Sequence, residues 1–299
     1  MPSRHKSNAS PVSFPVAVFG AGRFGRALCG ALRHANVRVC ALGIREGAHP
    51  TREQKALRVP LRAGATEFLA ALKSPTLVFV CVQDRNIYKA AAELGACPAS
   101  RRHRFVHACA TKGPLALEEL KQVGATTGAF HLLQSFGPSP FAWQRIAGCF
   151  AAIEAVGRLK RELWQLARAV GATPFEIRGS QRAAYHAAAV LASNALVTLL
   201  DAGERILSNA KFEKALAAKM LLPLVRGSLE NVALLGTEQA LTGPVVRGDA
   251  ETVKAHMIAL TRQDRELYRT MMQAALELAI RSGRLQEAEA KALRKVLES

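Results

Sequence analysis

The stretch "VAVFGAGRFGRAL" (residues 16–28) carries three glycines, Gly20, Gly22 and Gly25, at the spacing G-x-G-x-x-G. A short apolar run rich in β-favouring residues, "FPVAVFG" (residues 14–20), leads into them. A run of this kind that ends in glycine is typical of a buried parallel strand. The glycine spacing alone is a weak indicator, so its meaning depends on the segments that flank it.

A helix and a second strand follow the glycines. In "RFGRALCGALRHA" (residues 23–35) large apolar side chains recur at every fourth position, which predicts one buried helical face. The next segment, "VRVCALGI" (residues 37–44), is typical of a second buried strand. Together these segments form a strand–turn–helix–strand unit of the length that dinucleotide-binding folds use.

In this context each glycine has a physical role. Gly20 allows the tight turn, Gly22 lets a pyrophosphate approach the backbone, and Gly25 lets the helix pack closely on the strand. Free backbone N–H groups and the positive end of the helix dipole would hold the phosphates. We therefore predict that a nucleotide is bound by the residues of this turn, namely Gly20, Ala21, Gly22, Arg23, Phe24 and Gly25.

The end of the second strand favours NADP over NAD as the cofactor. An NAD site uses an Asp or Glu there for the ribose hydroxyls, whereas this sequence has Arg45 followed by Glu46. Arg45 suits the 2′-phosphate of NADP, and Arg23 in the glycine turn would help from the other side. The alternative is that Arg45 is solvated and that Glu46 binds the ribose.

A third apolar strand, "TLVFVCVQD" (residues 76–84), ends in Val82, Gln83 and Asp84. Ligands of open α/β sheets bind at the carboxyl ends of the strands. We therefore expect these three residues to contact the nicotinamide half of the cofactor. The alternative is an ordinary helix start in which Asp84 is the N-cap.

Apolar strands and helices continue to alternate up to about residue 178, and only helical patterns follow. This order predicts an α/β fold, with an N-terminal Rossmann-like doubly wound parallel sheet over residues 14–178 and a C-terminal all-helical domain over residues 179–299. Residues 1–13 are expected to be a flexible tail. The helix predicted over residues 182–210 is apolar on most faces, so we expect it to be buried on most sides.

The formal net charge of +18 comes mainly from the first half of the chain. Residues 1–150 carry 20 Lys and Arg against 7 Asp and Glu, whereas residues 151–299 carry 21 against 16. Solvated surface and an anionic cofactor or substrate both explain this excess. Nucleic acid is the least favoured partner, because few aromatic residues accompany the basic ones and no basic recognition helix is present.

The six cysteines are scattered and form no C-x-x-C pair or zinc-ligand spacing, which predicts reduced thiols and no metal site. No apolar stretch of membrane-spanning length lacks polar or charged residues, and the N-terminus does not have the pattern of a signal peptide. We therefore expect a cytoplasmic protein without a membrane partner.

Four longer segments carry a family resemblance. They are "FVHACATKG" (residues 105–113), "GAFHLLQSFGPSP" (residues 128–140), "YHAAAVLASNALVTLL" (residues 185–200) and "ALTGPVVRGDAETVKAHM" (residues 240–257). By these segments the chain, from about residue 14 to residue 270, resembles the Rossmann-like proteins with a C-terminal DUF2520 domain. Their fold is similar to that of pyrroline-5-carboxylate reductases and coenzyme F420-dependent NADP reductases. The resemblance implies an NADP-dependent oxidoreductase and does not identify its substrate.

The sequence departs from the family pattern at two places. Cys109 and Ala110 stand where the family has Ser-Gly, and Leu132 stands where it has Pro. Both departures are expected near the active cleft, so they imply a shifted substrate or a reduced activity.

Hydride transfer to a carbonyl or imine also needs one proton, and histidine is a natural donor near neutral pH. In a uniform α-helix Ser193, Asn194 and Asp201 would all lie within about 80° of His186, which makes one polar arc on an apolar helix. We predict that His186 is the proton donor and that Ser193 and Asn194 orient the substrate. A hydrogen-bond network at a helix or dimer interface is the alternative.

Other candidates lie elsewhere in the chain. His131 is expected at a strand end that faces the cleft, and it and His107 are either functional or satisfied core histidines. In "LTGPVVRGD" Thr242 and Arg247 would bind an anionic substrate. Alternatively, this segment is a turn whose Asp249 caps the next helix.

These patterns favour one function. The sequence has no G-x-S-x-G elbow, no Walker-type phosphate loop and no Tyr-x-x-x-Lys pair. We predict an NADP-dependent oxidoreductase that transfers hydride to or from a small C=O or C=N substrate bound between the two domains. The alternative is a non-catalytic NADP sensor or interaction module. The apolar helical domain also predicts a homodimer.

Overall fold

The computed structural model of the protein describes residues 12–298, so residues 1–11 of the predicted tail lie outside the described part. The chain divides into two compact units, Met1–Val190 and Leu191–Ser299. The predicted boundary at residues 178–179 falls just before helix α7 (Arg182–Val190), whereas the division falls at the end of that helix. The reason is that the first turns of α7 are bonded to the first unit, as described below.

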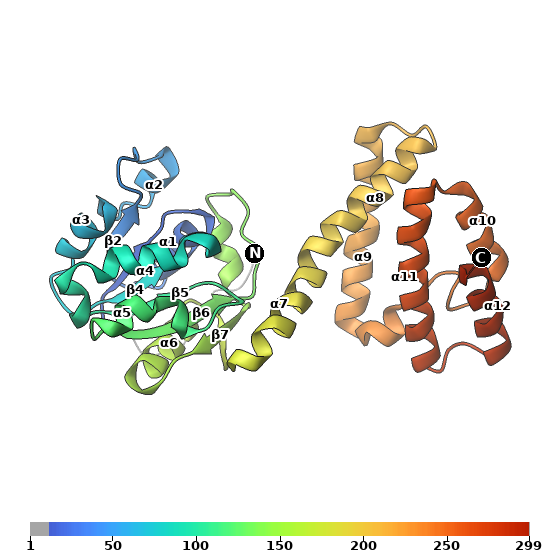
Figure 1. The fold of residues 1–299 in the computed structure, drawn as a ribbon. Helices are drawn as coiled ribbons and strands as arrows, with labels where there is room; N and C mark the ends of the chain where they lie inside the picture. The colour runs from blue at the N-terminus through green and yellow to red at the C-terminus, as the bar shows by residue number, and fades with distance from the viewer. Residues whose placement is uncertain (1–11, 299) are drawn as a thin grey trace. The chain divides into compact units, whose positions relative to one another are not determined.

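The first unit is built on one eight-stranded sheet with helices on both faces (Figure 1). The spatial order is β3-β2-β1-β4-β5-β6-β7-β8. The strands are β1 (Val16–Phe19), β2 (Val39–Ile44), β3 (Leu61–Ala63), β4 (Leu77–Val80), β5 (Arg104–His107), β6 (Thr126–Leu132), β7 (Phe150–Glu154) and β8 (Thr173–Glu176). This architecture confirms the predicted Rossmann-like fold class, with one difference in the sheet.

The difference is that β7 runs antiparallel to β6, whereas every other pair of neighbouring strands is parallel. A parallel pair needs a crossover connection that returns the chain to the same end of the sheet. The connection from β6 to β7 contains only the short helix η4 (Ala142–Ile146), so β7 begins at the end where β6 finished. The expectation of a wholly parallel sheet was therefore wrong at this junction.

Two apolar cores cover the two faces of the sheet. Side chains of α1 (Arg23–His34), η4 and α6 (Gly157–Ala169) pack on one face. Side chains of α3 (Gly64–Ala70), α4 (Ile87–Gly95) and α5 (Glu118–Gln122) pack on the other. The short α2 (Arg52–Ala56) and β3 have no counterpart among the elements expected from the sequence, because neither contains an apolar run.

Strand β1 lies in the middle of the sheet, between β2 and β4. The chain runs from β1 to β2 and β3 on one side and then crosses back over β1 to β4 on the other side. The carboxyl ends of β1 and β4 therefore border the crevice in which open α/β sheets bind their ligands. The glycine turn follows β1 directly, and the 3₁₀ helix η1 (Asp84–Asn86) lies shortly after β4. The fold thus places both predicted cofactor segments at one edge.

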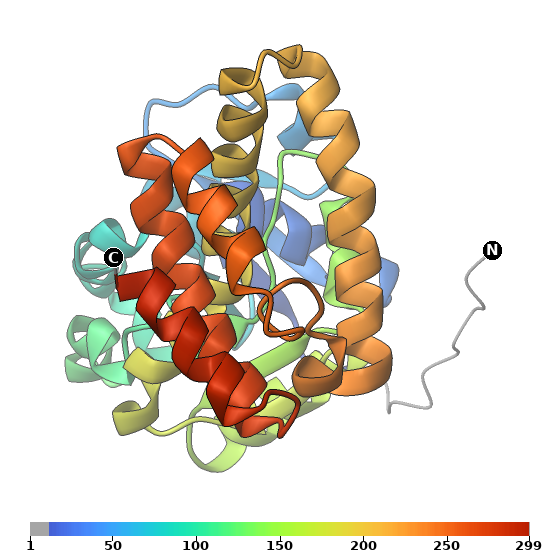
Figure 2. The ribbon, with the colours of Figure 1, turned by 90° about the vertical axis from the view of Figure 1, so that its right-hand side faces the viewer.

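The second unit is helical, as predicted (Figure 2). It contains a π-helical segment (Leu191–Ala195), α8 (Leu196–Asn209), α9 (Lys214–Ala240), α10 (Ala250–Ala259), α11 (Arg262–Arg281) and α12 (Glu287–Glu298). Its own core joins Val253 of α10, Leu276 of α11 and Leu293 of α12. Helix α9 is interrupted at Gly236, whose φ is +76°.

The apolar helices α7 and α8 are at most half-buried and α9 is mostly exposed, so the expected burial of the helix over residues 182–210 on most sides was wrong. From residue 182 to residue 209 only Arg182 and Ala202 are buried, and in α9 only Ala217 is. An apolar composition indicates that a helix favours a buried position. It does not show whether other segments of the same chain pack over that helix. The helix Gly179–Asn209 is also long and apolar enough to cross a membrane by length and composition, a test that core helices of soluble proteins also pass.

Candidate functional site

The glycine turn has the geometry that its spacing predicts. Gly20 has a φ of +112°, and a Cβ there would lie 2.5 Å from the Cys81 carbonyl oxygen. A Cβ at Gly25 would collide with the Gly20 carbonyl oxygen. These two glycines are therefore required by the fold itself.

Gly22 differs, because the fold alone does not require a glycine there. Its φ of −72° is open to any residue, and no atom lies within 4 Å of the position that a Cβ would take. Gly22 is the N-cap of α1, its first turn has no acidic residue, and no side chain caps it. The first N–H groups of α1 are thus left for an anion, which fits the pyrophosphate of a dinucleotide.

The other residues of the turn have structural contacts. The carbonyl oxygen of Ala21 accepts a hydrogen bond from Nε2 of Gln54 at 3.2 Å, which ties α2 to the turn. The ring of Phe24 packs edge-on against Phe136, with 5.5 Å between the centroids. Arg23 is exposed beside the turn. Gln54 was not predicted as a site residue, because no sequence pattern indicates a contact between α2 and the glycine turn.

Arg45 and Glu46, the two alternative residues for binding the ribose end of the cofactor, directly follow β2. Arg45 is exposed just after the strand. The carboxylate of Glu46 lies toward Gly64, where a Cβ would be 3.6 Å from Oε2, at the start of α3. Arg45 therefore remains the exposed cation at the place where a 2′-phosphate is expected.

The residues after β4 lie at the carboxyl edge as predicted, although the capping alternative was wrong. The N-cap of η1 is Gln83, and Asp84 is the first residue inside the helix. Gln83 accepts a hydrogen bond from Nε of Arg85 at 3.1 Å, and Val82 packs against the apolar core. The charge of Asp84 acts on the two histidines described next and raises the pKa of both, against the effect of burial.

His107, the last residue of β5, is fully hydrogen-bonded. Its Nε2 lies 2.9 Å from the carbonyl oxygen of Gly113, and its Nδ1 accepts from the backbone N–H of Cys109 at 3.2 Å. Burial lowers the pKa of His107, which keeps the ring neutral. His107 thus holds the loop after β5, as the satisfied-histidine alternative predicted.

His131 in β6 makes a different contact. Its Nδ1 lies 2.8 Å from the hydroxyl oxygen of Tyr185 in α7, and the two rings meet edge to face. Burial, followed by the charges of His186 and Arg182, lowers the pKa of His131 to about 4. Burial raises the pKa of Tyr185 to about 12. At neutral pH the pair therefore consists of a neutral imidazole and a protonated phenol.

The sheet register makes room for the Tyr185 ring. Ala152 in β7 pairs with His131 on one side and with Phe175 on the other, so these three residues form one row across the sheet. The ring of Tyr185 contacts both outer rings, at centroid distances of 5.6 Å to His131 and 5.9 Å to Phe175. The small side chain of Ala152 leaves the space between them for the phenol.

An ion pair fixes the beginning of α7 beside this row. Arg182 is 3% exposed and donates from Nε to the Glu154 carboxylate at 2.7 Å. Its Nη1 donates to the Ala110 carbonyl oxygen at 3.0 Å. Because α7 is held to both β7 and the loop after β5, the position of Tyr185 is set by the first unit alone.

His186 follows Tyr185 on the same helix. Its Nδ1 is buried and has no hydrogen-bond partner in the described part of the chain. A buried ring nitrogen without a partner is costly, so it is a candidate for contact with a bound ligand. His186 and His131 were predicted as site residues, whereas Tyr185 was not, because it lacks the Tyr-x-x-x-Lys spacing of a known catalytic pair.

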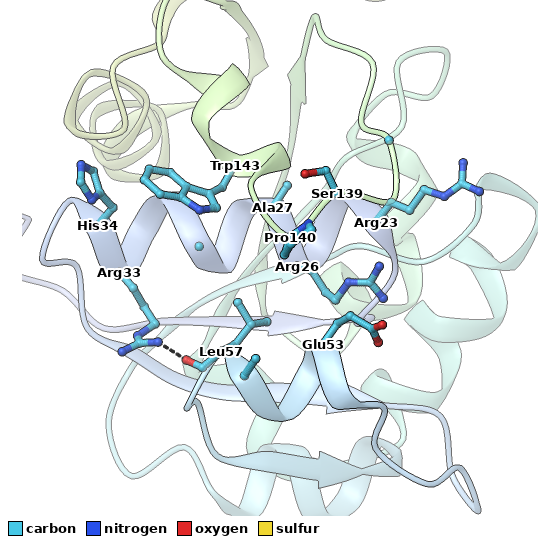
Figure 3. A pocket seen from close by; sticks show the side chains of 13 residues that line it. Arg23, Arg26, Ala27, Arg33, His34, Glu53, Leu57, Ser139, Pro140 and Trp143 are labelled. Carbon is cyan, nitrogen blue, oxygen red and sulfur yellow. Dashed lines mark hydrogen bonds between the residues drawn. The ribbon is translucent and has the colours of Figure 1, made fainter. Parts of the chain in front are cut away.

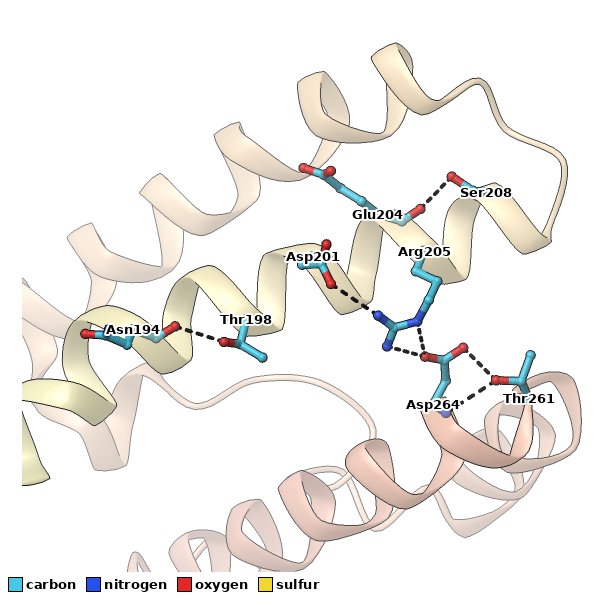
Figure 4. A network of polar contacts seen from close by, with 8 residues as sticks. All are labelled: Asn194, Thr198, Asp201, Glu204, Arg205, Ser208, Thr261 and Asp264. Atoms are coloured by element: carbon cyan, nitrogen blue, oxygen red, sulfur yellow. Dashed lines mark hydrogen bonds and ion pairs between the residues drawn. The ribbon is translucent and has the colours of Figure 1, made fainter. Parts of the chain in front are cut away.

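The helix that carries the predicted polar arc from His186 to Asp201 is not a uniform α-helix. Ser193 and Asn194 lie in the π-helical segment, where each backbone hydrogen bond spans five residues instead of four. The angular position of every later residue around the helix axis therefore differs from that in a uniform α-helix. Ser193 donates to Oδ1 of Asn194 at 2.9 Å. The Asp201 carboxylate instead accepts from Nη1 of Arg205 at 3.2 Å, within the network of Figure 4.

The departures from the family pattern occupy structural positions. Leu132 is 1% exposed and packs in the core under α1 and α6, on the opposite sheet face from His131. Cys109 is 2% exposed, and its Sγ lies 3.3 Å from Oγ1 of Thr111. The side chain of Leu132 therefore points away from the sheet face that carries His131.

The predicted anion-binding loop lies in the second unit. Asp249 is the N-cap of α10 and accepts from the backbone N–H of Thr252 at 2.9 Å, which confirms the capping alternative. Thr242 and Arg247 are both exposed in the same loop. Their role in substrate binding stays a prediction.

Comparisons with known proteins agree with this architecture. Residues 149–275 match the family described as "Domain of unknown function (DUF2520)", which confirms the resemblance. No curated protein sequence matches the chain. Among solved structures, a protein from Thermotoga maritima shares 22% identity over 89% of this chain and 98% of its own, with a TM-score of 0.68.

Two further structures are similar over nearly their whole length. A Bacteroides fragilis protein, described provisionally as an NADP oxidoreductase, shares 19% identity over 90% of this chain and 100% of its own, with a TM-score of 0.69. The pyrroline carboxylate reductase of Plasmodium falciparum, solved with NADP bound, shares 12% identity over 94% of this chain and 100% of its own, with a TM-score of 0.60. At these identities the likeness shows the fold.

Proposed function

We propose that this protein is an NADP-dependent oxidoreductase that reduces a small C=O or C=N group. The observation that carries the proposal is the turn at Gly22. There the fold leaves open space above a helix N-terminus without a side-chain cap, and the fold itself does not need a glycine. The N–H groups of α1 would hold the pyrophosphate, and Arg45 would bind the 2′-phosphate.

NADPH would supply the hydride, and the chain must supply the proton. Tyr185 is the group best placed for this, because its phenol is protonated at neutral pH and lies beside the carboxyl edge of the sheet. A proton on Nδ1 of His131 would be donated to the phenol oxygen. That bond leaves the phenol hydrogen for the substrate and stabilises the phenolate that forms.

His186 has a separate part in this proposal. Its unpartnered Nδ1 would bind the substrate heteroatom or its neighbouring polar group, rather than donate the proton. Ser193, Asn194, Thr242 and Arg247 stay candidates for substrate contacts from the second unit. An anionic substrate would use the Arg247 charge.

The experiment is a turnover screen of carbonyl and cyclic imine acceptors with NADPH, using wild type and Tyr185→Phe. The Phe variant keeps the ring contacts and loses only the hydroxyl, so kcat should fall by about 10²–10⁴-fold while NADPH affinity stays unchanged. Tyr88→Phe is the matched control, because Tyr88 is 57% exposed and its hydroxyl accepts a hydrogen bond from Lys112 outside the proposed site. NADPH binding without turnover of any acceptor would favour a non-catalytic NADP sensor.

We also propose that a second copy of the chain covers α9. This helix exposes large apolar side chains, including Leu224 (66%) and Leu234 (81%). Its charges divide by sign, with Lys214, Lys219 and Arg226 in the first half and Glu230 and Glu238 in the second. An antiparallel two-fold pairing centred on Ser228 would place Arg226 of one copy opposite Glu230 of the other.

A further inference from the structure

A pocket lies on the outer side of α1, away from the sheet (Figure 3). Its volume is about 440 Å³, within the range of small-molecule sites. Helix α1 forms its floor, α2 forms one wall, and the loop from Gly137 to Trp143 forms the other. All of these segments belong to the first unit.

The pocket is strongly basic. Arg23, Arg26 and Arg33 line it from α1, and Glu53 is the one acidic side chain among its lining residues. Arg26 and Arg33 are seven positions apart and so lie on the same side of the helix. A hydrogen bond from Thr51 and the charges of Arg26 and Arg52 lower the pKa of Glu53, so its carboxylate stays ionised. The three arginines still leave an excess of positive charge.

The arginines differ in what they contact. Arg33 donates to the carbonyl oxygen of Leu57 and so fastens the end of α2 to α1. Within residues 12–298 the guanidinium group of Arg26 makes no hydrogen bond, and its charge acts on the Glu53 carboxylate. A guanidinium group without hydrogen bonds fits a phosphate or carboxylate, which its fork can bind through two parallel hydrogen bonds.

The opposite end of the pocket is aromatic. The indole of Trp143 lies directly on Gly30, where a Cβ would be only 2.9 Å from the ring atoms Cγ and Cδ1. His34 stacks beside this indole, at 4.6 Å between ring centroids. A glycine at position 30 is what allows Trp143 to reach α1, and the aromatic wall faces the same hollow as the arginines.

The aromatic end does not coincide with the proposed pyrophosphate site. The pyrophosphate would bind over Gly22, whereas Gly30 and His34 belong to the last turns of α1, about 12–18 Å further along the helix. We propose that this pocket is a second ligand site, specific for a small aromatic phosphate monoester. Arg26 binds the phosphate, and the ring lies against Trp143.

Phenyl phosphate is the probe that tests this proposal, and the two tryptophans of the chain serve as reporters. Trp164→Phe leaves Trp143 as the only indole, and its fluorescence should change saturably with phenyl phosphate. Trp143→Phe leaves Trp164, which does not line the pocket and should not respond. Inorganic phosphate should bind more weakly than phenyl phosphate, since it lacks the ring.

Calorimetry on wild type, Arg26→Gln and Arg38→Gln then assigns the site. Arg26→Gln should weaken phenyl phosphate about tenfold or more, because a charge-assisted pair is lost. Arg38 is exposed outside the pocket, so Arg38→Gln should bind as wild type does. Circular dichroism verifies that each variant is folded.

A titration at saturating NADPH separates this site from the cofactor site. Phenyl phosphate should still bind in the presence of NADPH. Displacement by NADPH would overturn the proposal, because the pocket would then be part of the dinucleotide site, and unchanged binding by Arg26→Gln would overturn it as well. If NADPH itself does not bind, the proposed function fails while the phenyl phosphate test on the free protein still decides this proposal.

Discussion

The hydroxyl oxygen of Tyr185 lies 2.8 Å from Nδ1 of His131, although the two residues are 54 positions apart in the chain. The contact joins a helix to the sixth strand of the sheet and is secured by the ion pair of Arg182 with Glu154. It makes a buried polar pair at the edge where the fold binds ligands.

The buried histidines predict how stability depends on pH. Burial lowers the pKa of His131 and of His103 from the usual 6.5 to about 4. Between these values the unfolded chain binds more protons than the folded one, so the stability contribution is complete above pH 6.5 and is lost as the pH falls toward 4. Urea unfolding should therefore show lower stability at pH 5.0 than at pH 7.5.

His131→Gln provides the control for this pH effect, because it removes one titrating group and keeps a polar partner for Tyr185. Its stability should fall less between pH 7.5 and pH 5.0 than that of wild type. Equal stability of wild type at both pH values would contradict the assignment of neutral buried histidines.

The glycines of the turn predict a contrast between fold and binding. Gly22→Val should lower the melting temperature much less than Gly20→Val does, because a Cβ at position 22 meets no atom of the surrounding segments within 4 Å. It should weaken NADPH binding at least tenfold, since the side chain would occupy the place of the pyrophosphate. Gly20→Val should instead unfold or strongly destabilise the protein, because φ is positive and the Cys81 carbonyl is too close. Unchanged NADPH affinity in Gly22→Val would speak against the phosphate site.

A buried carboxylate holds α8 to α11 in the second unit (Figure 4). Asp264 is 2% exposed, accepts from Nε of Arg205 at 2.9 Å, and accepts from Oγ1 of Thr261 at 2.7 Å. Asp264→Ala should lower the free energy of unfolding by about 2–3 kcal/mol, because it removes the buried acceptor of Nε of Arg205 and of the Thr261 hydroxyl. Asp201→Ala is the control and should cost at most about 1 kcal/mol, since this second partner of Arg205 is exposed. Equal losses of unfolding free energy in Asp264→Ala and Asp201→Ala, measured by urea unfolding, would contradict the stronger stabilising role of Asp264.

The proposed pairing of α9 predicts a charge-reversal experiment. Arg226→Glu would place two like charges opposite each other twice in each dimer and should raise the dimer dissociation constant at least tenfold. The double variant Arg226→Glu with Glu230→Arg should restore the wild-type value, as measured by light scattering or sedimentation. A wild-type chain that remains monomeric, or a double variant no better than the single one, would reject this interface.

Local patterns were enough to predict most of the first unit. The glycine spacing, the apolar runs and the helical periodicity each depend on residues close together in sequence, and the structure has the corresponding strands and helices. The cap at Asp249 was among the predicted alternatives for the same reason. The antiparallel β7 was missed because strand direction depends on the path of the connection rather than on the strand residues.

The contacts that build the candidate site could not be predicted in this way. The row of His131, Ala152 and Phe175 depends on the register of three strands, and a one-residue shift would turn every side chain to the other face. The π-helical segment "LASNA" has no sequence pattern that distinguishes it from an α-helix, so this change in helix geometry could not be predicted. The exposure of α8 and α9 depends on what covers them, which a single sequence does not specify.

The most direct test of the proposed function is a fluorescence titration of the wild type and of Arg45→Ala with NADPH and with NADH. Wild type should bind NADPH about 10–100-fold more tightly than NADH, as expected for charge-assisted bonds to a 2′-phosphate. Arg45→Ala should lose that preference while its affinity for NADH stays the same. Equal affinity of wild type for the two cofactors, or unchanged NADPH affinity in Arg45→Ala, would contradict the assignment of NADP as the cofactor.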